Sequence, residues 1–415
     1  MSLGGYQGPR TAPDERRLRD HGRVPPLTID AARAKVLAEV RPLAVEDVPI
    51  AAALDCVLAE DVTAAGDVPA FPNSAMDGYA VASGPAGRRL RVTGESRAGA
   101  PADAAVGAGE AFRISTGAAL PDGADGVLQI ELVTVEGDEV LLNDAVAAGR
   151  NVRVAGDDLR AGELVLATGA PIGPAELGVA VSAGRATLRC ARRPSVAVLA
   201  TGDELVEPGT PLKPGELYNS NGYSLAALAG RAGAQVVEQG VVRDTERDTT
   251  AAIAAALEHA DVLVLSGGVS VGPHDHVKPA LAALGVREVF WRVALRPGRP
   301  IWFGVAPDGT LVFGLPGNPV SSMVTFLLFV RPALAALQGA PAPPRRLRAR
   351  TTEPLPRHPD RDECVRVTLD GGEATSTGPQ GSHQLSSMLG AGGLAIVPAG
   401  EGELPAGSEV EVEPV

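Results

Sequence analysis

The stretch DVLVLSGGVSVGPHDHVK (261–278) combines a hydrophobic strand with a glycine-rich turn. Its apolar residues at 262–265 are typical of a strand that is buried on both faces of a parallel sheet. Gly267 and Gly268 then let the backbone approach a ligand closely, and several N–H groups can face an anion there. Because ligands of open α/β sheets bind at the carboxyl ends of the strands, we predict a binding loop over 266–278.

The segments around this stretch repeat the same alternation of strands and helices. Strands are predicted at PSVAVLAT (194–201) and AQVVEQGVV (234–242), and helices at NSNGYSLAALAGRAG (219–233) and TTAAIAAALEHA (249–260). A buried helix is predicted for the apolar run VSSMVTFLLFV (320–330). Alternating buried strands and helices imply a mostly parallel sheet that is covered on both faces, so the fold class is α/β.

The rest of the chain is built from shorter segments. Thr28 can cap a helix that runs to about Val40. Short β-like runs alternate with Gly, Pro and Asp turns over 48–150, and short strands return after the Pro/Arg-rich stretch 341–350. Residues 1–26 are polar, lack the apolar centre of a signal peptide, and are predicted to be a disordered tail.

Composition excludes several classes of function. The 415 residues carry 37 Lys and Arg against 50 Asp and Glu, a net charge of −13, which disfavours binding to nucleic acid or to an anionic membrane. No uninterrupted apolar run reaches the roughly 18 residues of a membrane span. Cys56, Cys190 and Cys364 are far apart and form no CxxC pair, as suits a protein of the reducing cytoplasm.

Acidic residues follow two of the predicted strands. Asp203 and Glu204 end the first strand of the β/α region, and Asp275 and Lys278 follow the glycine turn. Carboxylates beside a phosphate site suggest Mg²⁺, and the lysine could neutralise phosphate. The alternative is a polar turn with a helix cap and surface charges.

Two further loops could bind an anion at the same end of the sheet. In ALRPGRP (294–300), Arg296 and Arg299 flank a Pro-Gly turn and offer guanidinium donors for phosphate or an oxyanion. In GLPGNPVSS (314–322), Gly317 and Asn318 precede a helix. A solvated turn explains the arginines equally well.

Three loops of the β-rich part hold polar residues among glycines. They contain Asp77 in FPNSAMDGYA (71–80), Thr116 in RISTGAALPDGAD (113–125) and Asp157 in RVAGDDLRAGE (153–163). Each could contact a ligand, and each is also explained by an ordinary Asx or glycine turn.

The glycine-rich stretch also admits two other kinds of chemistry. GVSVG (268–272) fits the G-x-S-x-G pattern, which would make Ser270 a hydrolase nucleophile, but three further residues separate it from the next helix, unlike a nucleophile elbow. His274 and His276 flank Asp275 and could bind zinc, but no third nitrogen or sulfur ligand is near in sequence, so solvated histidines are the alternative.

Taken together, the motifs resemble the MoeA family of molybdopterin molybdenumtransferases, which includes the E domain of gephyrin. The most specific are NSAMDGYA (73–80) and SGGVSVG (266–272), and they occur in the family's order with TGDEL (201–205), GLPGNPVSS (314–322) and the GSH tripeptide at 381–383. The resemblance implies insertion of molybdate into adenylated molybdopterin, with Mg²⁺ as cofactor and release of AMP.

The resemblance also implies roles for individual residues. The expected catalytic residues are Asp77, Thr116, Asp157, Glu204, Asp244, Asp275 and Lys278. The expected substrate-binding residues are Gly267, Gly268, Ser270, Arg296, Arg299, Gly317, Asn318 and Ser382, and the expected metal ligands are Asp203, Glu204 and Asp275. Arg296 and Arg299 stand where the family often has lysine, and an arginine presents a different donor geometry from an ammonium.

The architecture implied by the resemblance has several domains. It comprises a discontinuous linker and dimerisation domain (27–50 and 150–190), a β-rich domain (51–149), a three-layer α/β/α molybdopterin-binding domain (191–340) and a C-terminal β-barrel (345–415). A homodimer is also implied, with an active site between subunits, and a molybdopterin adenylyltransferase is a possible partner. The alternatives are a stand-alone adenylyltransferase with a similar fold and a gephyrin-like scaffold without catalysis.

Overall fold

The computed structural model describes residues 26–269, 276–341 and 346–415. The chain divides into two compact units. One unit is Ala44–Arg192, and the other joins the segment that ends at Leu43 to Arg193–Val415. Each unit is described by itself.

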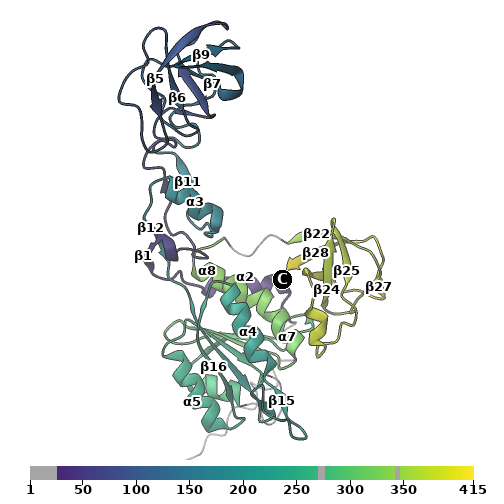
Figure 1. Cartoon of the computed structure of the whole chain (residues 1–415). Helices are drawn as coiled ribbons and strands as arrows, with labels where there is room; N and C mark the ends of the chain where they lie inside the picture. Colours follow the sequence, from purple (N-terminus) through teal and green to yellow (C-terminus); the bar gives the residue numbers. More distant parts are fainter. Residues whose placement is uncertain (1–25, 270–275, 342–345) are drawn as a thin grey trace, which may run out of the picture. The chain divides into compact units, whose positions relative to one another are not determined.

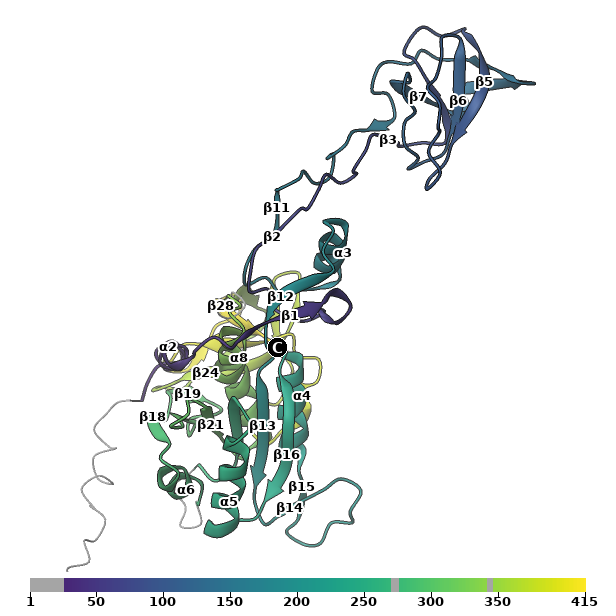
Figure 2. The ribbon, with the colours of Figure 1, turned by 90° about the vertical axis from the view of Figure 1, so that its left-hand side faces the viewer.

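A six-stranded sheet forms the centre of the larger unit (Figures 1 and 2). Its strands, in spatial order, are β16 (Gln235–Val242), β13 (Ser195–Thr201), β17 (Val262–Ser266), β21 (Leu311–Leu315), β20 (Trp302–Val305) and β18 (Arg287–Trp291). The first four are parallel, and β20 is antiparallel to both of its neighbours. The mostly parallel sheet expected from the sequence is therefore confirmed.

Helices cover both faces of this sheet. Along β13, Val196 and Val198 belong to one hydrophobic core, and Ala197 and Leu199 belong to another. Successive side chains point to opposite faces of a sheet, so both faces of this strand are buried. The first core packs against α2 (Ile29–Glu39), α4 (Ser220–Arg231), α7 (Pro319–Thr325) and α8 (Arg331–Leu337), and the second against α5 (Glu246–Leu257) and α6 (Val277–Ala283). This is the three-layer α/β/α arrangement that was expected.

The caps of three helices explain where these helices begin. Thr28 accepts a hydrogen bond from the Ala31 N–H (3.2 Å) at the start of α2, and the Asn219 side chain accepts one from the Gly222 N–H (2.9 Å) at the start of α4. Thr245 does the same for α5. Each side-chain oxygen satisfies an N–H that has no partner inside its helix.

The longest apolar helical run is Pro319–Leu337, in which the π-helical turn η3 (Phe326–Val330) joins α7 to α8. Within the described part of the chain, this run alone is long and apolar enough to cross a membrane, with a mean hydropathy of 1.8. However, 78% of it is buried inside the structure. It packs as the core helix that the sequence indicated.

Helix α2 packs against η3 and α8. Its Ala32 and Val36 are fully buried in the core of the α/β domain. The segment that was expected to belong to a linker domain with 150–190 thus includes a helix that covers the α/β sheet. The α2 side chains point into that core because the helix presents them on one face.

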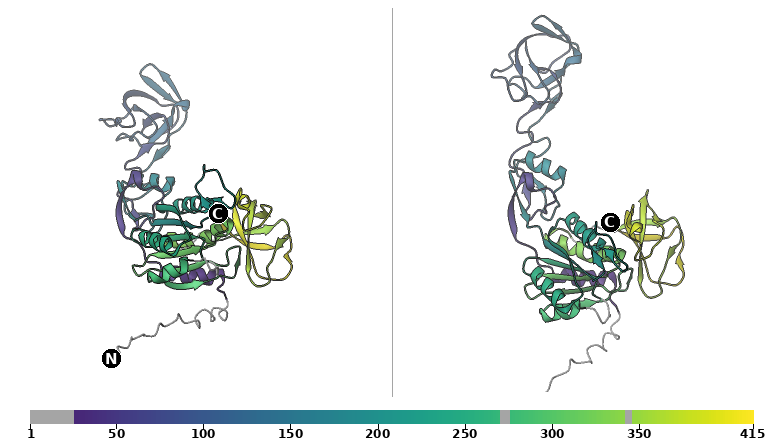
Figure 3. Two further views of the ribbon diagram at one scale, coloured as in Figure 1. Left: turned by 90° about the horizontal axis from the view of Figure 1, so that it is seen from below. Right: turned by 60° about the horizontal axis from the view of Figure 1, so that its bottom comes forward.

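A closed β-barrel forms the C-terminal part of the larger unit, shown in yellow in Figure 3. Its strands are β22 (Leu347–Thr351), β24 (Asp362–Asp370), β25 (Glu373–Ser376), β26 (Gly393–Val397) and β28 (Glu409–Pro414). The β24–β26 pairing closes the circle, as the sequence led us to expect. Short elements complete it: β23 (Leu355–Pro356) paired with β27 (Glu403–Leu404), the helical turn η4 (Leu385–Met388), and β19 (Leu295–Arg296) beside β24.

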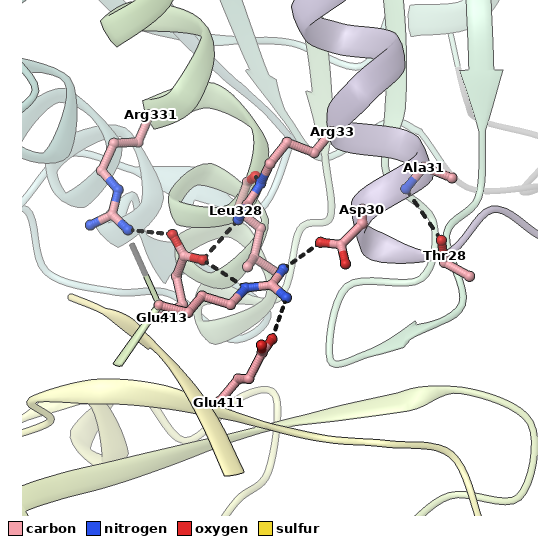
Figure 4. Close-up of polar contacts among 9 residues, drawn as sticks. Thr28, Asp30, Ala31, Arg33, Leu328, Arg331, Glu411 and Glu413 are labelled. Carbon is pink, nitrogen blue, oxygen red and sulfur yellow. Dashed lines mark hydrogen bonds and ion pairs between the residues drawn. The ribbon is translucent and has the colours of Figure 1, made fainter. Parts of the chain in front are cut away.

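A buried ionic cluster joins the barrel to the α/β domain (Figure 4). The Glu413 side chain on β28 is fully buried and accepts hydrogen bonds from Arg33 of α2 (2.8 Å), Arg331 of α8 (2.8 Å) and Arg346 (3.4 Å). The Arg33 guanidinium also donates to the Leu328 carbonyl (3.1 Å). These contacts hold the last strand of the chain against two helices of the α/β domain.

The smaller unit contains a second six-stranded sheet. Its strands, in spatial order, are β7 (Gly126–Gln129), β4 (Gly78–Val81), β6 (Glu110–Ile114), β5 (Arg89–Ser96), β9 (Glu139–Leu142) and β8 (Val133–Glu136). Three separate strand pairs also belong to this unit: β1 (Val45–Pro49) with β12 (Thr187–Ala191), β2 (Val62–Thr63) with β11 (Leu164–Leu166), and β3 (Asn73–Ser74) with β10 (Val152–Arg153). The helical elements are α3 (Pro174–Ser182), η1 (Ile50–Ala52) and η2 (Ile130–Leu132).

Candidate functional site

A cleft of about 880 Å³ opens at the carboxyl ends of β13, β17 and β21. This is the edge of a parallel sheet at which α/β proteins bind ligands. The cleft lining includes six residues that were singled out from the sequence: Glu204, Asp244, Gly267, Gly268, Gly317 and Asn318. Segments that are more than 100 residues apart in the chain therefore meet in one cavity.

The two glycines after β17 are required by their surroundings. Both have positive φ angles, 93° at Gly267 and 62° at Gly268. A Cβ atom on Gly267 would lie 2.7 Å from the Thr201 carbonyl oxygen, and one on Gly268 would lie 2.5 Å from a methyl group of Val277. A side chain at either position would collide with its neighbours, so the bare backbone faces the cleft.

Asn221, in the first turn of α4, ties the two sides of the cleft together. Its Nδ2 group donates to Ser266 Oγ (2.9 Å) at the end of β17 and to the Gly317 carbonyl (2.7 Å) after β21. Its Oδ1 atom is buried and has no hydrogen-bond partner among the described residues. Asn221 was not among the residues singled out from the sequence, because an asparagine in the first turn of a helix is explained locally as part of a cap.

Two carboxylates line the cleft, Glu204 after β13 and Asp244 after β16. Asp203 is not part of the lining, but its Oδ1 atom accepts a hydrogen bond from the Asp244 N–H (3.2 Å) and so connects the two loops. The three acidic residues come from neighbouring strands of the sheet, which brings the Glu204 and Asp244 side chains to the same cavity.

The C-terminal barrel also contributes to the cleft. The Ser382 hydroxyl accepts a hydrogen bond from Asn318 Nδ2 (3.0 Å), and its carbonyl accepts one from the Val320 N–H (3.1 Å). His383, the next residue, lines the cavity. Ser382 was expected to bind substrate; it does not line the cavity itself but bonds to Asn318, which does, and substrate binding by Ser382 stays a prediction. His383 was missed although it belongs to the same GSH tripeptide.

The arginines of the Pro-Gly turn do not line the cleft, although Pro300 of the same turn does. Arg296 lies 3.5 Å from Glu363 on the adjacent strand β24, and its side chain is 55% exposed. The Glu363 side chain is buried, and this burial raises the pKa of its carboxyl group above the usual range, although Arg296 acts in the opposite direction. A role for Arg296 and Arg299 in binding an oxyanion stays a prediction.

Lys278, at the start of α6, lies over an aromatic ring. Its ammonium nitrogen is 3.5 Å from the centroid of the Trp291 ring, and the guanidinium carbon of Arg292 is 3.9 Å from a centroid of the same side chain. β18 runs parallel to β21, so Trp291 ends its strand at the same edge of the sheet as the cleft. Two cations therefore gather on one indole at this edge.

The donor set of the cleft suits a magnesium ion. No group of three His, Cys, Asp or Glu side chains able to hold a metal occurs within residues 26–269, 276–341 and 346–415. Mg²⁺ is commonly bound in proteins by only one or two carboxylates together with substrate phosphates, and it prefers oxygen ligands. Glu204 and Asp244 meet that requirement.

Several residues singled out from the sequence lie outside the described residues. They are Ser270, His274 and Asp275, and with them the hydrolase and zinc interpretations of the loop. Asp275 as a metal ligand and Ser270 as a substrate-binding residue stay predictions.

In the smaller unit, the structure brings two of the three expected residues together. Asp77 Oδ1 accepts hydrogen bonds from the N–H (2.7 Å) and the hydroxyl (3.2 Å) of Thr116. Both residues are exposed at least in part. Asp157 is an exposed residue of a turn in which its N–H donates to the Val154 carbonyl (3.3 Å).

Three regions of the chain match known families. Residues 27–184 match the MoeA N-terminal region (domains I and II), residues 197–336 match a probable molybdopterin binding domain, and residues 348–415 match the MoeA C-terminal region (domain IV). Together these matches leave few residues of the described chain uncovered.

Curated relatives and solved structures extend over nearly the whole chain. The molybdopterin molybdenumtransferase of Haemophilus influenzae is 36% identical over 94% of this chain and 98% of its own length. Molybdopterin molybdenumtransferase 2 of Mycobacterium tuberculosis is 36% identical over 91% of this chain and 96% of its own. A crystal structure of the molybdopterin biosynthesis MoeA protein from Pyrococcus horikosii superimposes with a TM-score of 0.77 at 33% identity and covers 94% of this chain and 98% of that one.

Proposed function

This chain belongs to the MoeA family of molybdopterin molybdenumtransferases, and from this premise we propose that it is a Mg²⁺-dependent enzyme that inserts molybdate into adenylated molybdopterin and releases AMP. One observation carries the proposal. Glu204 and Asp244 share a cleft with the bare backbone of Gly267 and Gly268. The carboxylates can bind a Mg²⁺ ion, and the backbone N–H groups can bind phosphate oxygens. A phosphoanhydride substrate requires both kinds of group.

The chain's own groups would hold the phosphates on two sides. The backbone after β17 faces the cleft without side chains, and Ser220 and Asn221 place the first turn of α4 along the same cavity. The amino-terminal end of a helix carries unsatisfied N–H groups and partial positive charge, both of which favour a bound phosphate. Asn221 keeps these two sides at a constant separation through its bonds to Ser266 and Gly317.

Glu204 and Asp244 would hold the Mg²⁺ ion, with Asp203 positioning the Asp244 loop through its hydrogen bond. When bound, the ion offsets the negative charge of the phosphoanhydride and of the departing AMP. In the reaction, water attacks the molybdopterin phosphorus and its oxygen stays on that phosphate, while the electron pair of the broken P–O bond leaves on the AMP phosphate. In metal insertion, the two dithiolene thiols of the released molybdopterin bind molybdenum, and one molybdate oxygen leaves as water with their two protons.

We also propose that the enzyme works as a homodimer with an active site between subunits, and that a molybdopterin adenylyltransferase supplies its substrate. The family resemblance supports these two statements. The hydrogen-bonded pair of Asp77 and Thr116 would then act as a preformed polar element of the smaller unit.

The substitution Glu204→Gln tests the proposed reaction. We expect it to lower the rate of AMP release from adenylated molybdopterin and molybdate about 100-fold, because the neutral amide is a poor ligand for Mg²⁺. Removal of Mg²⁺ with a chelator is expected to stop AMP release from the parent protein. The rate is followed by chromatography of the released nucleotide.

Glu207→Gln is the matched control, because Glu207 lies three residues after Glu204 but its carboxylate accepts a hydrogen bond from Tyr223 and does not line the cleft. It should release AMP at the parent rate. A Glu204→Gln variant as active as the parent would contradict the proposal. Consumption of ATP and molybdopterin by the parent protein would instead favour the adenylyltransferase alternative.

A further inference from the structure

The cleft has one aromatic wall. The protein contains only 7 Phe, 4 Tyr and 2 Trp residues. Most of those in the described ranges are locked in the core; Phe303 and Phe313, for example, are completely buried. Of the Phe, Tyr and Trp side chains that the structure describes, Tyr218 is the one that lines the cleft, and it is 43% exposed.

The ring of Tyr218 belongs to a small apolar surface. Tyr218 ends β15 (Leu217–Tyr218), which pairs in parallel with β14 (Leu205–Val206). Leu205 and Leu217 also line the cleft, and Leu217 is 59% exposed. Figure 2 shows both short strands beside the ends of β13 and β16. An apolar surface that stays open to solvent inside the cleft indicates a ligand that is itself partly apolar.

The position of the Tyr218 ring is held by its own hydroxyl group, which donates to the Thr210 carbonyl (2.9 Å) across the loop between β14 and β15. The aromatic face therefore needs no further ordering when a ligand arrives, which reduces the entropic cost of binding.

Tyr218 also adjoins the part of the cleft that suits phosphate. It precedes Asn219, the residue that caps α4, and Ser220 in the first turn of that helix lines the same cavity. Ring and helix end are thus separated by a single residue along the chain. A flat ring linked to phosphate could contact both at once.

We propose that Tyr218 stacks against a flat heteroaromatic ring linked to phosphate and thereby selects the substrate of the cleft. The inference rests on the proposed function, whose substrate carries two such rings, adenine and pterin. Both have the same chemistry toward an aromatic side chain, and the experiment separates them. Stacking on an aromatic residue contributes enough per base to change affinity about tenfold or more.

The test compares two ligands that differ only in the ring. AMP and ribose 5-phosphate are titrated by calorimetry, in the presence of Mg²⁺, into the full-length protein and its Tyr218→Ala and Tyr218→Phe variants. We expect Tyr218→Ala to weaken AMP binding about tenfold and to leave ribose 5-phosphate binding unchanged. Tyr218→Phe keeps the ring and should bind AMP within about twofold of the parent.

Tyr223→Ala is the matched control. Tyr223 is 50% exposed, and its hydroxyl holds the same loop through Glu207 (2.7 Å), but its ring does not line the cleft. If Tyr218 acted only by anchoring the loop, Tyr223→Ala would weaken AMP binding as well. We expect it to bind AMP like the parent.

A pterin phosphate is titrated in parallel to identify the ring. If Tyr218→Ala loses affinity for AMP alone, Tyr218 stacks against adenine. If it loses affinity for the pterin phosphate alone, Tyr218 stacks against pterin. Unchanged binding of both ring-bearing ligands to Tyr218→Ala, or an equal loss for ribose 5-phosphate, would overturn the inference. Failure of the proposed function has a different signature, because the parent protein would then release no AMP from adenylated molybdopterin and molybdate, whatever Tyr218 contributes to ligand binding.

Discussion

The ionic cluster around Glu413 and the cleft around Asn221 are both rich in polar groups, but they differ in what satisfies those groups. At the cluster, the Glu413 carboxylate meets three guanidinium groups, and Arg346 also reaches Asp30 (2.6 Å) and Glu411 (2.8 Å). Burial alone would lower the pKa of Arg346, but its hydrogen bond to Glu411 and the charge of Asp30 raise it.

The cleft leaves polar atoms without protein partners. Asn221 Oδ1 and Thr201 Oγ1 are both buried and have no hydrogen bond to any described residue. An unsatisfied buried acceptor costs free energy unless something binds to it. Arg331 Nε of the cluster is also buried without a hydrogen-bond partner among the described residues, so an unmet polar atom does not by itself mark a ligand site. The comparison teaches that charge pairing inside the chain marks a structural junction, whereas unmet polar groups beside bare backbone that faces a cavity mark a place for a ligand.

The largest effect on stability is expected at the ionic cluster around Glu413. Glu413→Gln should lower the free energy of unfolding by about 3–5 kcal/mol, because three buried or half-buried arginines lose their shared counter-charge. Urea denaturation followed by circular dichroism measures the change. Glu411→Gln is the control, since this side chain is 54% exposed and contacts one of the same arginines. It should change stability by less than about 1 kcal/mol. Equal effects of the two substitutions would remove the distinction between the cluster and the surface.

A smaller effect on stability, but a larger one on activity, is expected in the cleft. Asn221→Ala removes the bonds to Ser266 and Gly317 and should cost about 1–2 kcal/mol of stability. Because the two sides of the cleft then separate, AMP release should fall about 10-fold to 100-fold. Asn143→Ala is the control, since Asn143 bonds to Thr134 (3.1 Å) in the smaller unit. If both variants release AMP equally fast, Asn221 does not position the site.

The smallest effect is expected at Glu363. This residue is intermediate between the ionic cluster and the cleft, because it is buried but has one ion pair, with Arg296 at 3.5 Å. Burial raises its pKa above the ordinary value of 4.5. The folded protein thus binds its proton more readily than the unfolded chain, and this contribution to stability is complete below pH 4.5 and is lost as pH rises through the folded-state pKa. Glu363→Gln should flatten this part of the stability–pH profile by about 1 kcal/mol.

Urea denaturation between pH 4 and pH 7 measures that profile. Glu353→Gln serves as the control, because Glu353 is an exposed residue of the same barrel. Parallel profiles for the parent and for Glu363→Gln would show that the buried carboxyl group does not contribute to the pH dependence.

Much of the α/β domain could be predicted from local patterns. The apolar runs predicted β13, β16 and β17, and Thr28 caps a helix where the sequence placed it. The helix expected over 219–233 is α4, which Asn219 caps. Strand and helix periodicity, capping and turn chemistry involve residues within about four positions of each other, so a sequence displays them directly. The expectation that Gly267 and Gly268 form a close backbone approach rested on the same kind of local signal.

The contacts that define the cleft and the junction were not predictable in this way. Asn318 and Ser382 are 64 residues apart in the chain, and Arg33 and Glu413 are 380 apart. Nothing in either local stretch specifies its partner. The role of Asn221 was hidden for the same reason, because an asparagine at a helix start has a sufficient local explanation as part of a cap.

The sequence by itself determined which segments become strands, helices and glycine turns, and it carried the motifs of the MoeA family. Only the tertiary structure decided that Ser382 reaches Asn318, that Asn221 ties Ser266 to Gly317, and that Tyr218 lines the cleft. The reason is physical: secondary structure follows from short-range sterics and hydrogen bonding, whereas these contacts arise only when the cores of the sheet and barrel pack and bring distant loops to one edge.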